Sequence, residues 1–485
     1  MKRWFLIATA VSVLATSLVA QQVQLGKAVQ PYVKVSAPRV VLTHVRVIDG
    51  TGKAPAEDQN IVIENGKIAA VQPGADVAQL TGMTVLNLRG ATVFPGLVGM
   101  HDHMYYIARP NLAADGSSEP PLMVPQMTFS SPRLYLAAGV TTLRTTGSVE
   151  PYTDLNLRTL IDRGEMVGPH MDVTGPYLEG GGSPFMQMHQ LKDAEDARKT
   201  VAFWADQGAT SFKAYMNITR EELAAAIQEA HHRGLKITGH LCSVTYPEAA
   251  DLGIDDLEHG FWVNTQLDPG KQPDVCPGTT GGPTLEHMDP ASAEAKALIE
   301  KLVSKHVAIT STLPVFENIV PGRPPLSKRN MEILSDEARE AYLYSRNRRY
   351  STAKGNEAAM LRRDMDLELT FARAGGLLLT GPDPTGNGGT FPGFGDQRGV
   401  ELLVEAGFTP VEAIKIATWN GALFMGKQES IGSIAAGKNA DLVVVKGNPA
   451  QKIDDIEQVE IVFKDGVGYD SAKLIESVRG RYGQY

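Results

Sequence analysis

The sequence predicts an α/β protein, namely a (β/α)8 TIM barrel with a small β-sandwich domain formed by both ends of the chain. The chain has 485 residues, 43% of them hydrophobic, so it can bury the core of a large barrel with an appendage. Its middle alternates short apolar strands with helical segments, which is typical of βα units around a parallel sheet. Its two ends consist of short strands and turns.

The β-rich ends carry clear hairpin signals. Residues 61–63 and 67–71 are two apolar runs joined by Asn65-Gly66, a strong two-residue turn signal. Near the other end, residues 441–445 and 459–463 look extended, and Asp465-Gly466 follows as another turn. We therefore expect residues 21–94 and 421–485 to form one composite β domain, with the barrel between them at 95–420.

The first twenty residues resemble a secretory signal peptide rather than part of the fold. Lys2 and Arg3 precede an apolar run from Phe5 to Ala20 that ends in small residues. An uncleaved membrane anchor is the alternative, but the run is short and contains Thr and Ser. We expect cleavage near Ala20 and export, either to a periplasm or out of the cell.

The mature chain is acidic. Removing residues 1–20 takes away two of the 46 Lys and Arg residues, which leaves a net charge of 44 − 55 = −11. No basic run indicates binding to nucleic acid, and no later stretch is apolar enough for a membrane. Cys242 and Cys276 either form one disulfide, as exported proteins allow, or remain two buried thiols.

The barrel prediction rests on eight strands and their connections. The expected strands are Leu97–His101, Val140–Thr145, His170–Gly175, Thr210–Tyr215, Lys236–His240, Asp256–His259, Ala308–Thr312 and Leu377–Thr380. The clearest helix runs from Arg220 to Arg233, with a Thr219/Glu222 capping box before it and Gly234 after it. Long loops at 111–131 and 264–290 should lie on the catalytic face, where we expect them to shape a pocket.

Five of the eight expected strands carry, at or near their ends, residue types that can bind metals. His101 and His103 follow an apolar strand at spacing i, i+2, so both imidazoles point to the same side. Taken singly, each further candidate has a structural explanation, such as a hydrogen-bonded core histidine or a turn aspartate. These candidates are Lys213, His240, His259 and Asp383. Lys213 is unusual, because a buried ammonium is costly, and reaction with CO₂ would convert it to a carboxylate-like ligand.

In their order along the chain, these residues resemble the motif set of the amidohydrolase superfamily. The segment from Gly432 to Val443, GSIAAGKNADLV, also resembles the superfamily's return into its β domain. Within the superfamily, the chain most resembles the imidazolonepropionase-like group, which includes metal-dependent carboxypeptidases and prolidases. True imidazolonepropionases are expected to hold one metal without a bridging lysine, so Lys213 favours the two-metal, peptidase-like branch.

The resemblance implies a binuclear site. His101, His103 and Asp383 would bind the more buried metal, His240 and His259 the more exposed one, and Lys213, carboxylated by CO₂, would bridge them. The donors suit Zn²⁺, although Mn²⁺ or Co²⁺ would also be accepted.

Two residues are expected to take part in the reaction itself. Asp383 would move the proton from the attacking water to the leaving nitrogen. Tyr215 shares the inward face with Lys213 and either stabilises the oxyanion or packs in the barrel.

The expected function is an exported metal-dependent hydrolase that cleaves an amide C–N bond in a small molecule, either a dipeptide or an N-acyl amino acid. Arg144 and Arg323 are candidates for binding the substrate carboxylate, and His189 is a candidate contact, whereas His170 should be structural. The alternatives are a cyclic amide or lactone hydrolase and a non-catalytic binding protein, which would be expected to lose Asp383 or Lys213 first. Relatives commonly assemble into homo-oligomers, so this chain could do the same.

Overall fold

The computed structural model describes residues 24–74, 82–106, 123–183, 185–323, 325–385 and 389–484. The predicted signal segment lies outside these residues. Within them, no helix is both long enough and apolar enough to cross a membrane.

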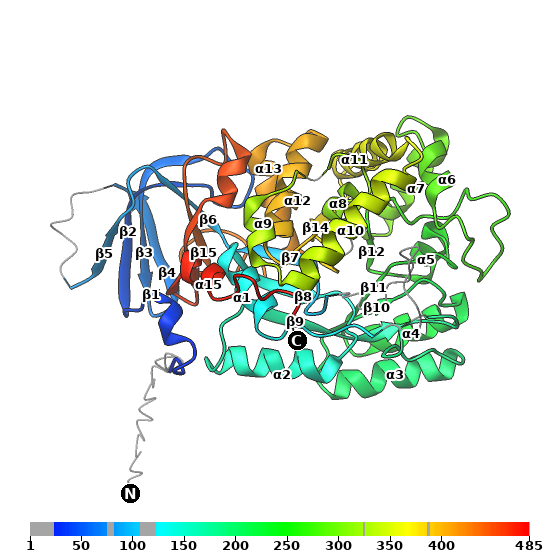
Figure 1. Cartoon of the computed structure of the whole chain (residues 1–485), viewed down its shortest axis with the longest axis horizontal. Coiled ribbons are helices and arrows are strands. Elements are labelled where there is room, and N and C mark those ends of the chain that lie inside the picture. Colours follow the sequence, from blue (N-terminus) through cyan, green and yellow to red (C-terminus); the bar gives the residue numbers. More distant parts are fainter. Residues whose placement is uncertain are drawn as a thin grey trace, which may run out of the picture.

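A sheet of eight parallel strands forms the larger part of the molecule (Figure 1). Neighbours in the sheet follow the order of the chain from β7 to β14, as the βα rhythm predicts. The strands are β7 (Leu97–Asp102), β8 (Val140–Thr145), β9 (His170–Leu178), β10 (Ser211–Ala214), β11 (Lys236–Gly239), β12 (Asp256–Glu258), β13 (Ala308–Ser311) and β14 (Leu378–Thr380). All eight predicted strands are confirmed. β9 extends beyond its predicted end at Gly175, because Tyr177 and Leu178 continue the pairing with β10.

The first and last strands meet at a glycine. The backbone N–H of Asp383 donates to the carbonyl of His101 over 3.1 Å. A Cβ on Gly381 would collide with the backbone of His101, so only glycine allows this close approach. The contact nearly closes the barrel and places the residues after β14 beside those that end β7.

Helices cover the outside of the barrel (Figure 1). Those that lie between barrel strands along the chain are α1 (Ser130–Ala137), α2 (Pro151–Asp162), α3 (Ala194–Asp206), α4 (Arg220–His232), α5 (Tyr246–Leu252), α6 (Gly282–His287), α7 (Ala293–Ser304), α8 (Leu313–Glu317), α9 (Lys328–Ile333), α10 (Asp336–Thr352) and α11 (Glu357–Arg373). After the last barrel strand come α12 (Phe394–Ala406), α13 (Pro410–Lys415) and α14 (Gly421–Phe424), and α15 (Ser471–Glu476) follows the mixed sheet. The predicted capping box is present at the start of α4, where Thr219 Oγ1 accepts from the N–H of Glu222.

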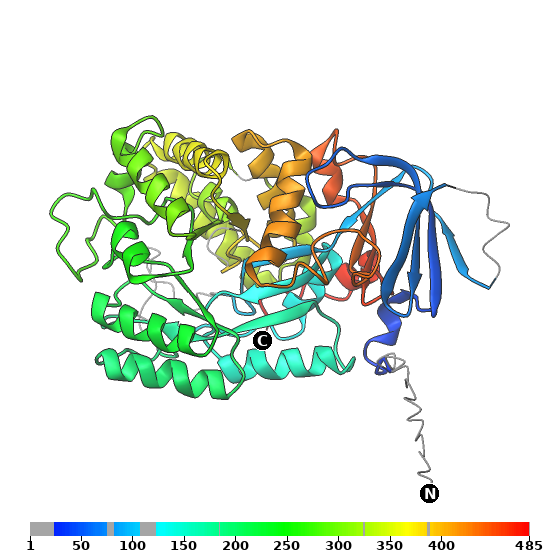
Figure 2. The same ribbon diagram turned by 180° about the vertical axis from the view of Figure 1, so that it is seen from behind.

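A mixed sheet of nine strands contains both ends of the chain and stands beside the barrel (Figures 1 and 2). Its strands are β1 (Val33–Val35), β2 (Arg39–Val47), β3 (Ala56–Glu64), β4 (Lys67–Pro73), β5 (Thr84–Asn87), β6 (Ala91–Pro95), β15 (Leu442–Lys446), β16 (Val459–Lys464) and β17 (Val467–Asp470). β15 from the C-terminal part pairs with β6 from the N-terminal part. The composite β unit predicted from both ends is therefore present.

Alternate side chains of the central strand β15 pack into two different hydrophobic cores. Leu442 and Val444 pack into the core of the mixed sheet, whereas Val443 and Val445 face the core shared with the barrel. Successive side chains of a strand point to opposite faces, so one fully buried strand can serve both cores. After β17, helix α15 packs against α1, and Tyr482 lies edge-on to the rings of Tyr106 and Phe391.

Candidate metal centre

The structure brings all six predicted metal-binding residues together at the carboxyl end of the barrel. Lys213 Nζ lies 3.1 Å from His101 Nε2, and Asp383 Oδ1 lies 3.2 Å from His103 Nε2. The ring centroids of His240 and His259 are 4.3 Å apart. These residues come from strands that are far apart in sequence, and parallel strands present their carboxyl ends at one rim.

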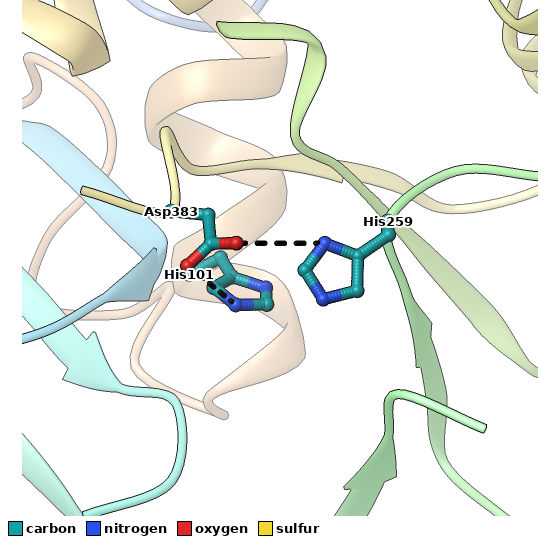
Figure 3. A group of neighbouring side chains, drawn as sticks. All are labelled: His101, His259 and Asp383. Atoms are coloured by element: carbon teal, nitrogen blue, oxygen red, sulfur yellow. Dashed lines mark ion pairs between the residues drawn. The ribbon is translucent and has the colours of Figure 1, made fainter. Parts of the chain in front are cut away.

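Asp383 is the centre of this group. Its carboxylate reaches between the imidazoles of His101 and His259, as Figure 3 shows. Oδ1 is 3.6 Å from His101 Nε2, and Oδ2 is 3.9 Å from His259 Nδ1. Asp383 thus faces histidines from both predicted halves of the site.

A buried carboxylate orients His101. Glu258 Oε2 accepts a hydrogen bond from His101 Nδ1 at 2.8 Å, and Glu258 Oε1 accepts one from Arg144 Nη2 at 2.7 Å. All three side chains are at most 1% exposed. Because His101 Nδ1 is engaged in this way, Nε2 is the nitrogen that faces Lys213 and Asp383. Histidine ligands of metals are commonly oriented by a carboxylate in the same manner.

His259 and Asp383 both adopt backbone conformations that side chains rarely take. Their φ angles are +73° and +54°. Such conformations cost about 1–3 kcal/mol each and concentrate at functional sites. His259 is further held by a 2.9 Å hydrogen bond between its Nδ1 and Thr312 Oγ1. The surrounding structure therefore fixes both side chains in the cavity.

Burial dominates the electrostatics of the site. It lowers the pKa of Lys213 to about 8 and that of His240 to about 3. Although burial raises the pKa of Asp383, the neighbouring His101, His103 and Lys213 outweigh it and hold that pKa below its usual value. At neutral pH the histidines are therefore neutral ligands and Asp383 is a carboxylate, which are the protonation states that metal binding requires.

The donor set fits divalent metal ions. His101, His259 and Asp383 offer one ligand atom each, and these atoms lie within 4.8 Å of one another. His103 Nδ1 and His259 Nε2 are buried without a hydrogen-bond partner. Buried polar atoms rarely remain unpaired, and imidazole nitrogens with carboxylate oxygens are the donors that Zn²⁺ binds.

A cavity of about 180 Å³, here called the catalytic cavity, opens above these residues. Its lining residues are Tyr105, Val124, Val149, Tyr177, Phe185, Met188, Lys213, Tyr215, His240, His259, Asp383 and Thr385. His101 and His103 do not line it and are almost fully buried. This difference in depth agrees with the expected assignment of these two histidines to the more buried metal.

Several other candidate residues lie elsewhere. Arg144 is buried against Glu258, and Arg323 pairs with Glu317 and Glu405, so neither lines the catalytic cavity. His189 pairs with Asp196 over 2.9 Å on the surface. His170 lies at the opposite end of its strand, 3.0 Å from Asp465, in agreement with a structural role.

The two long loops differ in what they contribute. In the first, Val124 lines the catalytic cavity, whereas residues 111–122 lie outside the described part of the chain. No described lining residue comes from residues 264–290, contrary to expectation. That loop is instead attached to the residues after β11 by a disulfide between Cys242 and Cys276, whose Cα atoms are 4.8 Å apart.

Sequence reasoning missed four residues that shape the site. Glu258 precedes a predicted ligand directly, and Thr312 ends a predicted strand, but their partners are distant in sequence. Tyr105 and Tyr177 share a 2.6 Å hydrogen bond between their hydroxyls beside the metal-binding residues. Tyr177 could have been found from the sequence by extending the predicted strand β9, which brings it opposite Lys213.

A family model and a curated protein each match a short segment of this chain. The Amidohydrolase family model matches residues 386–468, a segment that begins after Asp383 and contains none of the six metal-binding candidates. Adenine deaminase 2 of Bradyrhizobium sp. (strain ORS 278) is 36% identical over 69 residues, which are 14% of this chain and only 12% of that protein.

Solved structures match over most of the chain. A Xaa-Pro dipeptidase with bound methionine has a TM-score of 0.67 at 20% identity, over 89% of this chain and 100% of that one. The A. niger ochratoxinase has a TM-score of 0.63 at 19% identity, over 92% and 100%. The family model thus matches a short segment of this chain, whereas these solved structures resemble it over most of its length. At these identities, the structural likeness itself shows the amidohydrolase fold, and the assignment of individual residues rests on the site geometry.

Proposed function

We propose that this chain is a metal-dependent amidohydrolase that cleaves an amide C–N bond in a small molecule, with dipeptides and N-acyl amino acids as the substrate class. One observation carries the proposal. Six donor side chains from five strand ends meet around Asp383 at the floor of a single cavity. The resemblance to the amidohydrolase superfamily supports hydrolysis of an amide bond. The buried Lys213 favours the two-metal, peptidase-like branch of that superfamily.

The proposed site holds two divalent ions, with Zn²⁺ as the favoured metal. His101, His103 and Asp383 would hold one, His240 and His259 the other, and Lys213 as a carbamate would bridge them. When bound, the ions would supply an acidified water molecule and a polarised substrate carbonyl. Lys213 supports this arrangement, because its Nζ lies within hydrogen-bonding distance of His101 and burial lowers its pKa to about 8. A neutral amine is the form that reacts with CO₂.

Asp383 is the proposed proton carrier. Its side chain is 13% exposed and lines the catalytic cavity. It would therefore contact both the histidines of the site and a substrate bound in the cavity. It would accept the proton of the attacking water at a carboxylate oxygen and then donate it to the leaving nitrogen.

Tyr215 is the proposed oxyanion donor. Its ring is 4.9 Å from that of His240 and lines the cavity. Burial raises the pKa of Tyr215 above its usual value, so the hydroxyl stays protonated and can donate a hydrogen bond to the developing negative charge.

A cluster of aromatic and aliphatic side chains lines the catalytic cavity beside the metal-binding candidates. Tyr105, Val124, Val149, Tyr177 and Met188 form one buried cluster, with Phe185 and Tyr215 packed against it. An apolar wall favours a hydrophobic side chain or acyl group on the substrate. This feature supports small peptides and N-acyl amino acids with apolar groups.

We also propose that the chain is exported. The disulfide between Cys242 and Cys276 supports this location, because such bonds persist in oxidising compartments. Fractionation of producing cells, with N-terminal sequencing of the mature protein, tests it. A protein found inside the cell with residues 1–20 intact would contradict export.

The metal content and activity of two variants test the function. Purified mature protein should contain about two metal ions per chain, and Lys213→Ala should lose one or both. Asp383→Asn should abolish hydrolysis of dipeptides and N-acyl amino acids. A panel that also contains cyclic amides and lactones checks the substrate class. Absence of metal from the wild type, or full activity of Asp383→Asn, would contradict the proposed mechanism.

A further inference from the structure

The hydroxyl groups of two tyrosines in the catalytic cavity have no part in the function proposed above. Tyr105 follows strand β7, Tyr177 lies near the end of β9, and both line the cavity. Their hydroxyl oxygens are 2.6 Å apart, which is the distance of a short hydrogen bond. These two residues are here called the tyrosine pair.

The barrel fixes the position of the tyrosine pair. Tyr177 is the Cα partner of Lys213 where β9 pairs with β10, so both side chains point to the inside of the barrel. Gly147 leaves room for the Tyr177 ring, because a Cβ at Gly147 would lie only 2.5 Å from it. The Tyr105 ring stacks on that of His103, with centroids 4.5 Å apart. The pair therefore borders the metal-binding candidates.

The tyrosine pair has one more hydrogen than the contact between its members uses. Each phenol carries one O–H donor, so the pair has two hydrogens, and the mutual hydrogen bond takes one of them. Within the part of the chain that the structure describes, neither hydroxyl has another hydrogen-bonding partner. Burial raises the pKa of both hydroxyls well above the usual value, so both stay protonated at neutral pH. One O–H donor is thus left unused at the wall of the cavity.

The described residues that line the catalytic cavity include no arginine. Arg144 and Arg323, which the sequence offered for binding a substrate carboxylate, are paired with acidic residues elsewhere. Lys213 lines the cavity, but it belongs to the metal-binding candidates. Because buried donors are nearly always hydrogen-bonded, the unused O–H of the tyrosine pair indicates an acceptor on the bound substrate.

We propose that the tyrosine pair selects substrates that carry an oxygen acceptor, such as a carboxylate or a carboxamide, on the carbon that bears the scissile nitrogen. The inference rests on the proposed function and deepens it, because it names a group that the cavity recognises beside the amide bond. The Tyr177 ring is 4.9 Å from that of Tyr215, the proposed oxyanion donor. Tyr215 would contact the scissile carbonyl, and the pair would contact the group next to it.

Three N-acetyl compounds that differ in one group test this selection. N-acetyl-leucine carries a carboxylate, N-acetyl-leucinamide carries a carboxamide, and the third compound has a methyl group in that position. We expect kcat/KM of the wild type to be about tenfold or more higher for the first two, because the methyl compound leaves the buried donor unpaired. Comparison of the first two separates a charged acceptor from a neutral one. Equal kcat/KM for all three compounds would overturn the proposal.

Removal of both hydroxyls should abolish this preference. The double variant Tyr105→Phe, Tyr177→Phe keeps both rings and should hydrolyse the three compounds with similar kcat/KM. The loss should appear in KM, with kcat little changed, because a contact with a non-reacting group forms equally in the ground state and the transition state. Tyr344→Phe, at an exposed tyrosine of α10, is the control and should keep the wild-type preference. A preference retained in the double variant would refute the proposal.

Single variants test whether the two hydroxyls act as one unit. Each hydroxyl orients the other, so Tyr105→Phe and Tyr177→Phe should each lose most of the preference that the double variant loses. Losses that add independently would contradict a role for the pair. The single variants also keep the test available if the double variant does not fold.

Calorimetric titration separates this inference from the proposed function. If the wild type hydrolyses none of the three compounds, the proposed substrate class fails, and their dissociation constants then test the pair alone. Tighter binding of the two oxygen-bearing compounds by the wild type, but not by the double variant, would support the pair. Equal dissociation constants in both proteins would overturn it. Hydrolysis with the same preference in both proteins would leave the proposed function standing and refute the pair.

Discussion

Glu258 accepts a hydrogen bond from His101 Nδ1 at 2.8 Å, and both side chains are fully buried. The contact determines which nitrogen of His101 faces the other metal-binding residues. Glu258 also accepts from Arg144, so each of its oxygens has one charged or polar donor. Although burial raises the pKa of Glu258, Arg144 and Lys213 outweigh it and lower that pKa overall, so the residue is a carboxylate.

Glu258→Gln should weaken metal binding. An amide replaces one carboxylate oxygen with an NH₂ donor, which would face either Arg144 or His101. We expect metal affinity to fall by about 10–100-fold, as for other residues that orient metal-binding histidines. Competition with a chromophoric chelator measures the affinity. Glu221→Gln, at an exposed carboxylate of α4, is the control, and equal affinity in both variants would contradict the role.

Arg144→Met should destabilise the fold. It removes the 2.7 Å partner of Glu258 and leaves a buried charge uncompensated. Breaking a buried pair in this way costs about 3–5 kcal/mol in free energy of unfolding. Urea denaturation measures this change. Arg198→Ala removes an exposed arginine paired with Glu195 and should have no measurable effect, so similar losses in both would contradict the prediction.

Recovery of the metal-free protein should depend on bicarbonate. Lys213 is buried beside His101, and its pKa of about 8 leaves a share of neutral amine to react with CO₂. Added Zn²⁺ should therefore restore activity faster with bicarbonate present. Lys192→Ala, which changes an exposed lysine, should keep this response. Recovery at the same rate in CO₂-depleted buffer would argue against the carbamate.

Tyr215→Phe should lower kcat and change KM little. The variant keeps the ring against His240 and Tyr177 but loses the hydroxyl. Removing one oxyanion donor costs about 10²–10³ in kcat. Steady-state kinetics with the best substrate of the panel measures both constants. Tyr152→Phe, at a half-exposed tyrosine of α2, is the matched control, and an unchanged kcat in Tyr215→Phe would leave this residue a packing role only.

Reduction of the disulfide should destabilise the protein. The bond joins residues that are 34 positions apart, and the loop-closure model gives up to about 4 kcal/mol for that separation. Urea denaturation with and without dithiothreitol measures the difference. The double variant Cys242→Ser, Cys276→Ser should show no response to dithiothreitol. An equal midpoint in both conditions for the wild type would contradict the prediction.

The candidate metal-binding residues could be predicted from the sequence, because they occupy simple local patterns. His101, His240, His259 and Asp383 each lie at or just after the end of a short apolar strand. Parallel strands place their carboxyl ends on one rim, so their order along the chain was enough to bring them together. The capping box of Thr219 and Glu222 was equally local, and it is present as predicted.

Other features depend on which side chains meet across the closed barrel. Glu258 lies 157 positions from His101, and Thr312 lies 53 positions from His259. In the sequence, Arg144 was a candidate for binding the substrate carboxylate, but β8 directs it inward against Glu258. Such pairings are set by strand register and barrel closure, which no local pattern encodes.

The sequence by itself determined the barrel, the composite sheet and the candidate metal-binding residues, because strand periodicity and turn signals act over a few neighbouring positions. Only the tertiary structure decided how His101 is oriented and that Cys242 meets Cys276. These features join residues that are brought together when the layers pack, and packing selects partners by shape and burial rather than by distance along the chain.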